Sequence, residues 1–249
     1  MSKHRNLCLP FLNLLVAACL LALSACGGGG SSSNNEIGSF SAGLTVAQLN
    51  GTWTGTVDTG GLHTLSVTIA AGSITQVLID GVDQSLTGTI TQKSKTLFAV
   101  VLNGIETRLL VNNTGAYAVY VNTNFDFGVI RKSGTLPLPT FNVADVDGTW
   151  SGQSLTTDFT TATTFASSGT CASETCSNVG NGVTASMDLT ATFSANFGNW
   201  TGNYVVAMPT ETGDVSLLMS DDKNFVGFHQ CKTAGTFPVD CKISAWVRQ

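Results

Sequence analysis

The sequence predicts an all-β protein of two tandem small antiparallel up-and-down β-barrels, about eight strands each, behind a flexible N-terminal tether. Three observations support this prediction. Turn signals recur about every ten residues, apolar side chains alternate with hydroxyl side chains between the turns, and one stretch of the chain is repeated. Of 249 residues, 27 are glycine and only 11% are charged, which favours strands over helices.

The repeat is clearest at 46–55, which recurs at 143–152 with Gly-Thr-Trp at matching positions. Each copy also ends on a segment that carries an arginine, Arg131 in the first copy and Arg248 in the second. A stretch that contains two prolines separates the copies and is expected to be extended. The predicted boundaries are 45–132 for the first barrel, 133–141 for the linker and 142–249 for the second barrel.

Strands can be placed in the first copy because each lies between turn signals. The longest alternation in the second copy covers 185–193, where apolar residues interleave with Ser, Asp and Thr. The cysteine-bearing stretch 167–182 is interpreted as an inserted hairpin or loop, because the second copy is longer than the first. The expected strands of the first copy are 52–57, 64–70, 74–79, 85–91, 96–102, 106–111, 117–121 and 127–132.

A short lead-in before Gly-Thr-Trp on the first strand, with an arginine on the last strand, resembles the lipocalin and avidin group of barrels. The resemblance implies that Trp53 and Trp150 each plug one barrel end. It also implies that Arg131 and Arg248 pack over the two rings in cation–π contacts. Both copies are shorter than a typical lipocalin, and small eight-stranded barrels are usually filled by side chains.

The N-terminus has the features of a secretory signal, which we place at 1–25. Lys3 and Arg5 precede a ten-residue apolar run at 14–23, too short to span ~30 Å of hydrocarbon. The Leu-Ser-Ala-Cys sequence that ends at Cys26 resembles the bacterial lipobox, which implies acylation of Cys26, for example by palmitate. The alternative is an ordinary signal peptide with a cysteine near its cleavage site.

The residue after Cys26 is glycine, which resembles lipoproteins sorted to the outer membrane, on its periplasmic face or at the cell surface. Residues 26–44 then form the lipid-bearing cysteine and a Gly/Ser-rich flexible tether. Four cysteines follow, an even number that suits an oxidising compartment. The local pairs Cys171–Cys176 and Cys231–Cys241 are expected because each brackets a short turn-like segment. The other pairings and a zinc site stay open, although the spacings are not those of common zinc sites.

No set of residues indicates catalysis. The Asp58-Thr59-Gly60 sequence matches an aspartic-protease motif, but no second copy exists, so a turn is expected. A calcium loop beginning at Asp145 lacks its later oxygen ligands. His63 and His229 are the only histidines after the signal, and nothing places either beside a nucleophile. We therefore expect no enzyme, no metal and no cofactor.

The net charge of −5, without a basic cluster beyond the N-terminus, excludes a nucleic-acid partner. Membrane contact is expected through the lipid anchor only. The leading functional prediction is a non-catalytic envelope binding module for a protein or glycan, with specificity in 167–182 and 231–241. The alternatives are an envelope-protection or hydrolase-inhibitor lipoprotein and a carrier of a small apolar ligand, which needs a cavity of about 300 Å³.

Overall fold

The structure is a computed structural model that describes residues 43–124, 126–156, 163–180, 183–206, 211–232 and 241–249. The predicted signal peptide, Cys26 and nearly all of the tether lie outside these residues, and their assignments stay predictions. In the described part of the chain, no helix combines the length and the apolar character that a membrane span requires.

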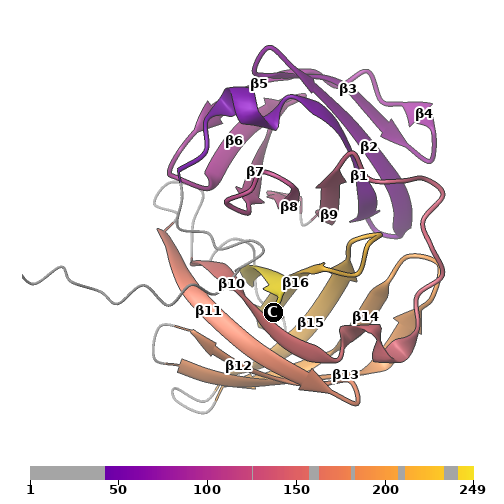
Figure 1. Cartoon of the computed structure of the whole chain (residues 1–249), viewed down its shortest axis with the longest axis vertical. Coiled ribbons are helices and arrows are strands. Elements are labelled where there is room, and N and C mark those ends of the chain that lie inside the picture. The colour runs from indigo at the N-terminus through magenta and orange to yellow at the C-terminus, as the bar shows by residue number, and fades with distance from the viewer. Residues whose placement is uncertain (1–42, 125, 157–162, 181–182, 207–210, 233–240) are drawn as a thin grey trace, which may run out of the picture. The chain divides into compact units, whose positions relative to one another are not determined.

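Repeat 1 is a closed antiparallel barrel of eight strands, as the sequence predicts (Figure 1). Neighbouring strands in the chain are neighbours in the ring, and β2 pairs with β3 and with β1. A two-residue strand, β4 (Val82–Asp83), pairs with β3 outside the ring. The ring strands are β1 (Gly51–Asp58), β2 (Leu62–Ala70), β3 (Ser73–Ile79), β5 (Gly88–Gln92), β6 (Leu97–Leu102), β7 (Ile105–Val111), β8 (Tyr117–Asn122) and β9 (Phe127–Lys132).

Repeat 2 is a second closed barrel of eight strands that follow one another around the ring (Figure 1). Its longest strand is irregular, because the pairing of β13 with β14 shifts between Thr190 and Thr192. The strands are β10 (Gly148–Thr156), β11 (Thr163–Ala172), β12 (Thr175–Gly180), β13 (Val183–Ser194), β14 (Asn199–Val206), β15 (Glu211–Met219), β16 (Phe225–Lys232) and β17 (Cys241–Arg248).

A single 3-10 turn precedes each barrel, η1 (Val46–Leu49) in repeat 1 and η2 (Val143–Val146) in repeat 2. The Trp53 indole nitrogen donates a hydrogen bond to the Leu49 carbonyl at 2.8 Å, and Trp150 does the same to Val146 at 2.9 Å. Both indoles are buried. We call the end of each barrel that carries this turn its helical end, and the opposite end its open end.

The strand register corrects the role expected of Arg131. Trp150 pairs with Arg248, but Trp53 pairs with Lys132 rather than with Arg131. Arg248 lies over the Trp150 ring, 4.3 Å from its centroid, while Lys132 donates to the carbonyl of Gln48 on η1 at 2.8 Å. Because side chains alternate along a strand, Arg131 points to the other face of β9 and does not contact Trp53.

The cysteine-bearing stretch 167–182 is not an insertion. Its described part forms the β11–β12 hairpin, which is a regular part of the repeat 2 ring. Cys171 faces Cys176 across this hairpin, and the two form a disulfide. Cys231 and Cys241 form the second disulfide, between the end of β16 and the start of β17. Each disulfide therefore joins directly opposed residues of neighbouring strands.

The two barrels share an apolar core formed by outward-facing side chains of both repeats. Val129 and Phe127 of repeat 1 belong to one cluster with Ala245 and Ile243 of repeat 2. Tyr117 stacks on Phe225 with ring centroids 5.1 Å apart. The outer faces of β8 and β9 are therefore buried rather than solvated.

An ion pair at the edge of this core holds Arg131. The Arg131 guanidinium donates two hydrogen bonds to Asp221, at 2.5 and 2.7 Å, and Asp221 also accepts from the backbone and hydroxyl of Thr135. The Asp221 side chain is only 2% exposed. Asp222 accepts a hydrogen bond from the Tyr117 hydroxyl. The linker and both repeats meet at this turn of repeat 2.

Candidate functional site

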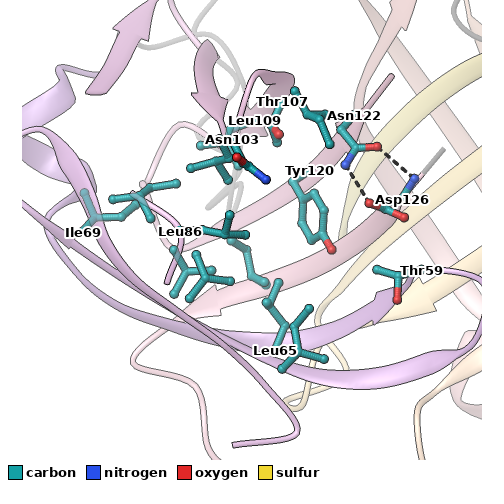
Figure 2. Close-up of a pocket in the computed structure, with 17 residues that line it drawn as sticks. Thr59, Leu65, Ile69, Leu86, Asn103, Thr107, Leu109, Tyr120, Asn122 and Asp126 are labelled. Atoms are coloured by element: carbon teal, nitrogen blue, oxygen red, sulfur yellow. Dashed lines mark hydrogen bonds between the residues drawn. The ribbon is translucent and has the colours of Figure 1, made fainter. Parts of the chain in front are cut away.

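Repeat 1 is hollow. A cavity of about 230 Å³ lies inside its barrel and is lined by seventeen residues, most of them aliphatic (Figure 2). Ile69, Leu109 and Ile130 lie toward the helical end, since the same side chains also lie next to Trp53. Small eight-stranded barrels are usually filled by their own side chains, so the space is a specific property of this repeat.

The cavity is smaller than the roughly 300 Å³ at which pockets for drug-sized ligands begin. The expected carrier of a small apolar ligand, for which about 300 Å³ was required, is therefore not supported at that size, and only a smaller molecule fits. An apolar cavity of about 150 Å³ admits benzene. By proportion, the repeat 1 cavity of 230 Å³ accommodates a molecule of roughly nine non-hydrogen atoms.

The polar lining residues lie toward the open end. Thr59 follows β1, Asn103 follows β6, and Asp126 precedes β9, so all three belong to turns at the same end of an up-and-down barrel. Thr59 and Asn103 are exposed, so the cavity reaches the surface of the protein here. The Asn122 amide donates to the Asp126 carboxylate at 2.7 Å (Figure 2).

Tyr120 is the largest polar side chain in the lining. Figure 2 shows its ring projecting into the cavity, with the hydroxyl turned toward Thr59 and Leu65. Burial raises the pKa of Tyr120 well above its ordinary value, and the negative charges of Asp126 and Asp58 raise it further. The hydroxyl is therefore a neutral hydrogen-bonding group in an electrostatically negative environment.

Repeat 2 has no counterpart of this cavity among its described residues, because large side chains fill the equivalent space. The register shows the correspondence: Ile130 pairs with Gly55 on the first strand of repeat 1, and Trp246 pairs with Gly152 on the first strand of repeat 2. Trp246 is fully buried in the repeat 2 core. Where repeat 1 has an isoleucine beside empty space, repeat 2 has an indole.

The Trp246 ring fits because its neighbours are small. A Cβ atom at Gly169 would lie 2.6 Å from the ring, so the indole lies directly over this glycine. The Trp246 nitrogen donates to the Ser167 hydroxyl at 2.7 Å, and the ring packs on Phe228 with centroids 4.6 Å apart. The sequence shows these residues, but only the register reveals which of them face one another.

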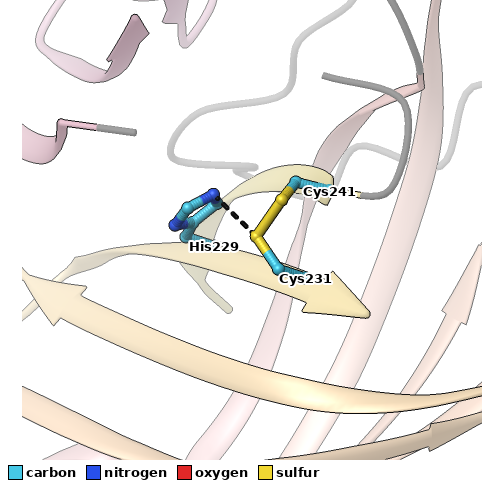
Figure 3. A group of neighbouring side chains, drawn as sticks. All are labelled: His229, Cys231 and Cys241. Carbon is cyan, nitrogen blue, oxygen red and sulfur yellow. Dashed lines mark hydrogen bonds between the residues drawn. A yellow bond between two sulfur atoms is a disulfide. The ribbon is translucent and has the colours of Figure 1, made fainter. Parts of the chain in front are cut away.

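His229 lies beside the second disulfide. Its Nε2 atom is 3.1 Å from the Cys231 sulfur, and Cys241 completes the group (Figure 3). Both sulfurs are bonded to each other and cannot be thiolate ligands, so the geometry gives no support to a zinc site. Burial lowers the pKa of His229 to about 4, and the ring stacks on Phe127. His229 is a neutral packing residue.

The other candidate residues lie in turns. Asp58 ends β1, and Thr59 and Gly60 begin the turn that follows, with Gly60 at a φ of 83°. His63 pairs with Asp80 at 2.7 Å on the surface. Asp145 belongs to η2, and its carboxylate forms an ion pair with Lys223 at 2.7 Å. These residues do not come together in one site.

Comparisons with known proteins give no family. No protein-family model matches the chain, and no curated protein sequence matches it. A protein of unknown function from Nostoc punctiforme, of the DUF3598 family, is similar with a TM-score of 0.33 at 9% identity, over 81% of this chain and 97% of that one. A tryptophan-to-alanine mutant of transferrin-binding protein B from Haemophilus parasuis has a TM-score of 0.36 at 8% identity. That match covers 80% of this chain and 64% of the transferrin-binding protein.

Proposed function

We propose that this protein is a non-catalytic binding module of the bacterial cell envelope, and that repeat 1 binds a small apolar molecule in its barrel. The observation that carries the proposal is the difference between the repeats. One barrel encloses an apolar cavity of about 230 Å³, and the other fills the equivalent space with Trp246 and its neighbours. An apolar cavity that reaches the surface at one end is the usual form of a small-molecule site, which supports the proposal.

Binding of naphthalene to the full chain tests this function. Naphthalene is neutral, rigid and close to the size that the cavity admits. For a ligand of this size, we expect one site per chain with a dissociation constant on the order of 10 to 100 µM. Fluorescence titration and equilibrium dialysis measure both values. Binding that does not saturate, or that saturates at two sites per chain, would contradict the proposal.

We also propose that Cys26 carries the lipid that anchors the protein, with the Gly/Ser-rich segment as a tether. The lipobox-like sequence that ends at Cys26 supports this anchor. Radioactive palmitate is expected to label the wild-type chain and not the Cys26→Ala variant. Equal labelling of the two proteins would refute the anchor and would leave the ligand site unaffected.

A second function is recognition of a protein or glycan, for which the sequence predicts specificity in the segments 167–182 and 231–241. The described part of the first segment consists of paired barrel strands, and residues 233–240 lie outside the described residues. No specific observation favours this function over the cavity. An envelope-protection or inhibitor role is likewise not favoured by any contact in the structure.

A further inference from the structure

We infer that the ligand of repeat 1 is an uncharged amphiphile, with an alcohol or carbonyl group that hydrogen-bonds to the hydroxyl of Tyr120 or of Thr107, and that carboxylates are rejected. This inference deepens the proposed function and rests on it. The volume of the cavity limits the size of the ligand, and its lining residues determine which functional group and charge the ligand carries.

The first argument is that two hydroxyl groups in the lining have no protein partner. Thr107 is 5% exposed and Tyr120 is partly buried, and neither hydroxyl forms a hydrogen bond to any residue that the structure describes. Neither oxygen is among the fully buried polar atoms that lack a partner, so both remain accessible from the cavity and can hydrogen-bond to a ligand there.

The second argument is that Thr107 and Tyr120 face the cavity from neighbouring strands of one wall. Leu109 of β7 pairs with Tyr120 of β8, and Thr107 lies two residues before Leu109, so its side chain points to the same face. Diagonal neighbours across antiparallel strands lie within reach of one small group. A ligand oxygen atom can therefore reach the Tyr120 hydroxyl or the Thr107 hydroxyl while its apolar part extends toward Ile69 and Ile130.

The third argument comes from repeat 2, which lacks both hydroxyls. Leu217 pairs with Phe228 as Leu109 pairs with Tyr120, so Phe228 occupies the position of Tyr120 and Val215 that of Thr107. The filled barrel has apolar residues at both positions, and the hollow barrel has hydroxyl groups. The fold thus tolerates phenylalanine and valine here, and the hydroxyls of repeat 1 are not needed to form the barrel.

Electrostatics decides the charge of the ligand. Among the lining residues that the structure describes, Asp126 is the only ionisable group besides Tyr120, and none is a lysine, arginine or histidine. A carboxylate ligand would lose its hydration and face this negative charge without a cation to compensate it. An ammonium group would also lose its hydration in the apolar part of the cavity, because Asp126, the only carboxylate among the described lining residues, lies at the open end.

The test uses four probes that share a phenyl ring and a chain of similar length: n-propylbenzene, 2-phenylethanol, 2-phenylethylammonium and phenylacetate. Each probe displaces naphthalene from the full-length protein. We expect phenylacetate to bind at least tenfold more weakly than 2-phenylethanol, and the ammonium to bind more weakly than the alcohol. Phenylacetate or the ammonium binding as tightly as the alcohol would overturn the inference.

Variants that copy repeat 2 test the hydrogen bonds. At least one of the variants Tyr120→Phe and Thr107→Val is expected to weaken the binding of 2-phenylethanol about three- to tenfold, the effect of losing one net hydrogen bond. Binding of n-propylbenzene should stay within about twofold of the wild-type value, because no hydrogen bond is lost. Equal weakening of both probes would refute the role of the hydroxyls.

Asp126→Asn tests the charge. Removal of the carboxylate is expected to reduce the disadvantage of phenylacetate relative to 2-phenylethanol by about threefold or more, and an unchanged ratio would refute the electrostatic argument. If naphthalene and n-propylbenzene bind but the head groups make no difference, this inference fails and the proposed function stands. If no probe binds, both fail.

Discussion

The Ile130→Trp variant is expected to lose at least tenfold in affinity for naphthalene. The substitution places an indole where repeat 2 has Trp246, and this indole projects into the space that the ligand needs. Two bulky groups cannot share a cavity of about 230 Å³. The measurement is the fluorescence titration used for the wild-type chain, and circular dichroism shows whether the barrel is retained.

The matched control is Ile130→Leu, which keeps the apolar volume and leaves the cavity open. Its affinity is expected to stay within about threefold of wild type, since volume-conserving apolar exchanges perturb a core little. Wild-type affinity in a folded Ile130→Trp variant would show that naphthalene binds elsewhere. Repeat 1 has Val67 and Leu65 at the register positions of Gly169 and Ser167, so the indole meets larger neighbours and is expected to lower the free energy of unfolding by about 1–3 kcal/mol. The titration is therefore made on a sample that circular dichroism shows to be folded.

The Asp221→Asn variant is expected to lower the free energy of unfolding by about 3 kcal/mol. Removal of one partner of a buried ion pair costs about 3–5 kcal/mol. We use the lower end of this range of free energies because the Arg131 side chain is 24% exposed and can be partly rehydrated. Denaturant unfolding of the full chain measures the change. Asp83→Asn, on an exposed edge of repeat 1, is the control and should change the stability by less than about 0.5 kcal/mol.

The same pair predicts a dependence on pH. Burial alone would raise the pKa of Asp221, but the hydrogen bonds from Arg131 and Thr135 outweigh it and hold the pKa below its ordinary value. A carboxyl group with a lowered pKa in the folded state stabilises the protein fully above its unfolded pKa of about 4. This stabilisation is lost as the pH falls below that value, and Asp221→Asn should lack that part of the acid sensitivity. An acid-unfolding profile identical to wild type would contradict this role.

Much of the fold could be predicted from the sequence because its signals are local. The alternation of Leu65, Val67 and Ile69 with hydroxyl residues specifies a strand with one buried face, and β2 has this pattern of burial. The two 3-10 turns and the cysteine pairs also lie where short-range patterns placed them. These features depend on residues that are close together in the chain.

The role of Arg131 could not be predicted in this way. Aligning the two copies by their arginines equates Arg131 with Arg248, but the register equates Lys132 with Arg248. A shift of one residue sends a strand side chain to the opposite face. One sequence feature does indicate that the repeats pack together. Leu217, Leu218 and Met219 form an unbroken apolar run rather than an alternation. Such runs indicate burial on both faces, here inside the barrel and between the repeats.

The cavity was also beyond the reach of the sequence. Composition shows that repeat 2 has more tryptophan, but whether a barrel is filled depends on which residues face each other across it. Trp246 fills repeat 2 only because Gly169 and Ser167 lie opposite it. Because both copies are short, the sequence predicts that side chains fill both barrels. The described residues of repeat 2 have such a core, whereas repeat 1 contains a cavity.

Intermolecular nuclear Overhauser effects between naphthalene and the methyl groups of the labelled full chain test the central claim most directly. The structure predicts contacts from the ligand to Ile69, Leu109 and Ile130, which line one cavity inside repeat 1. It predicts no contact to Met187, which lies in the filled core of repeat 2. Ligand contacts to Met187, or to exposed methyl groups alone, would contradict the assignment of repeat 1 as the binding barrel.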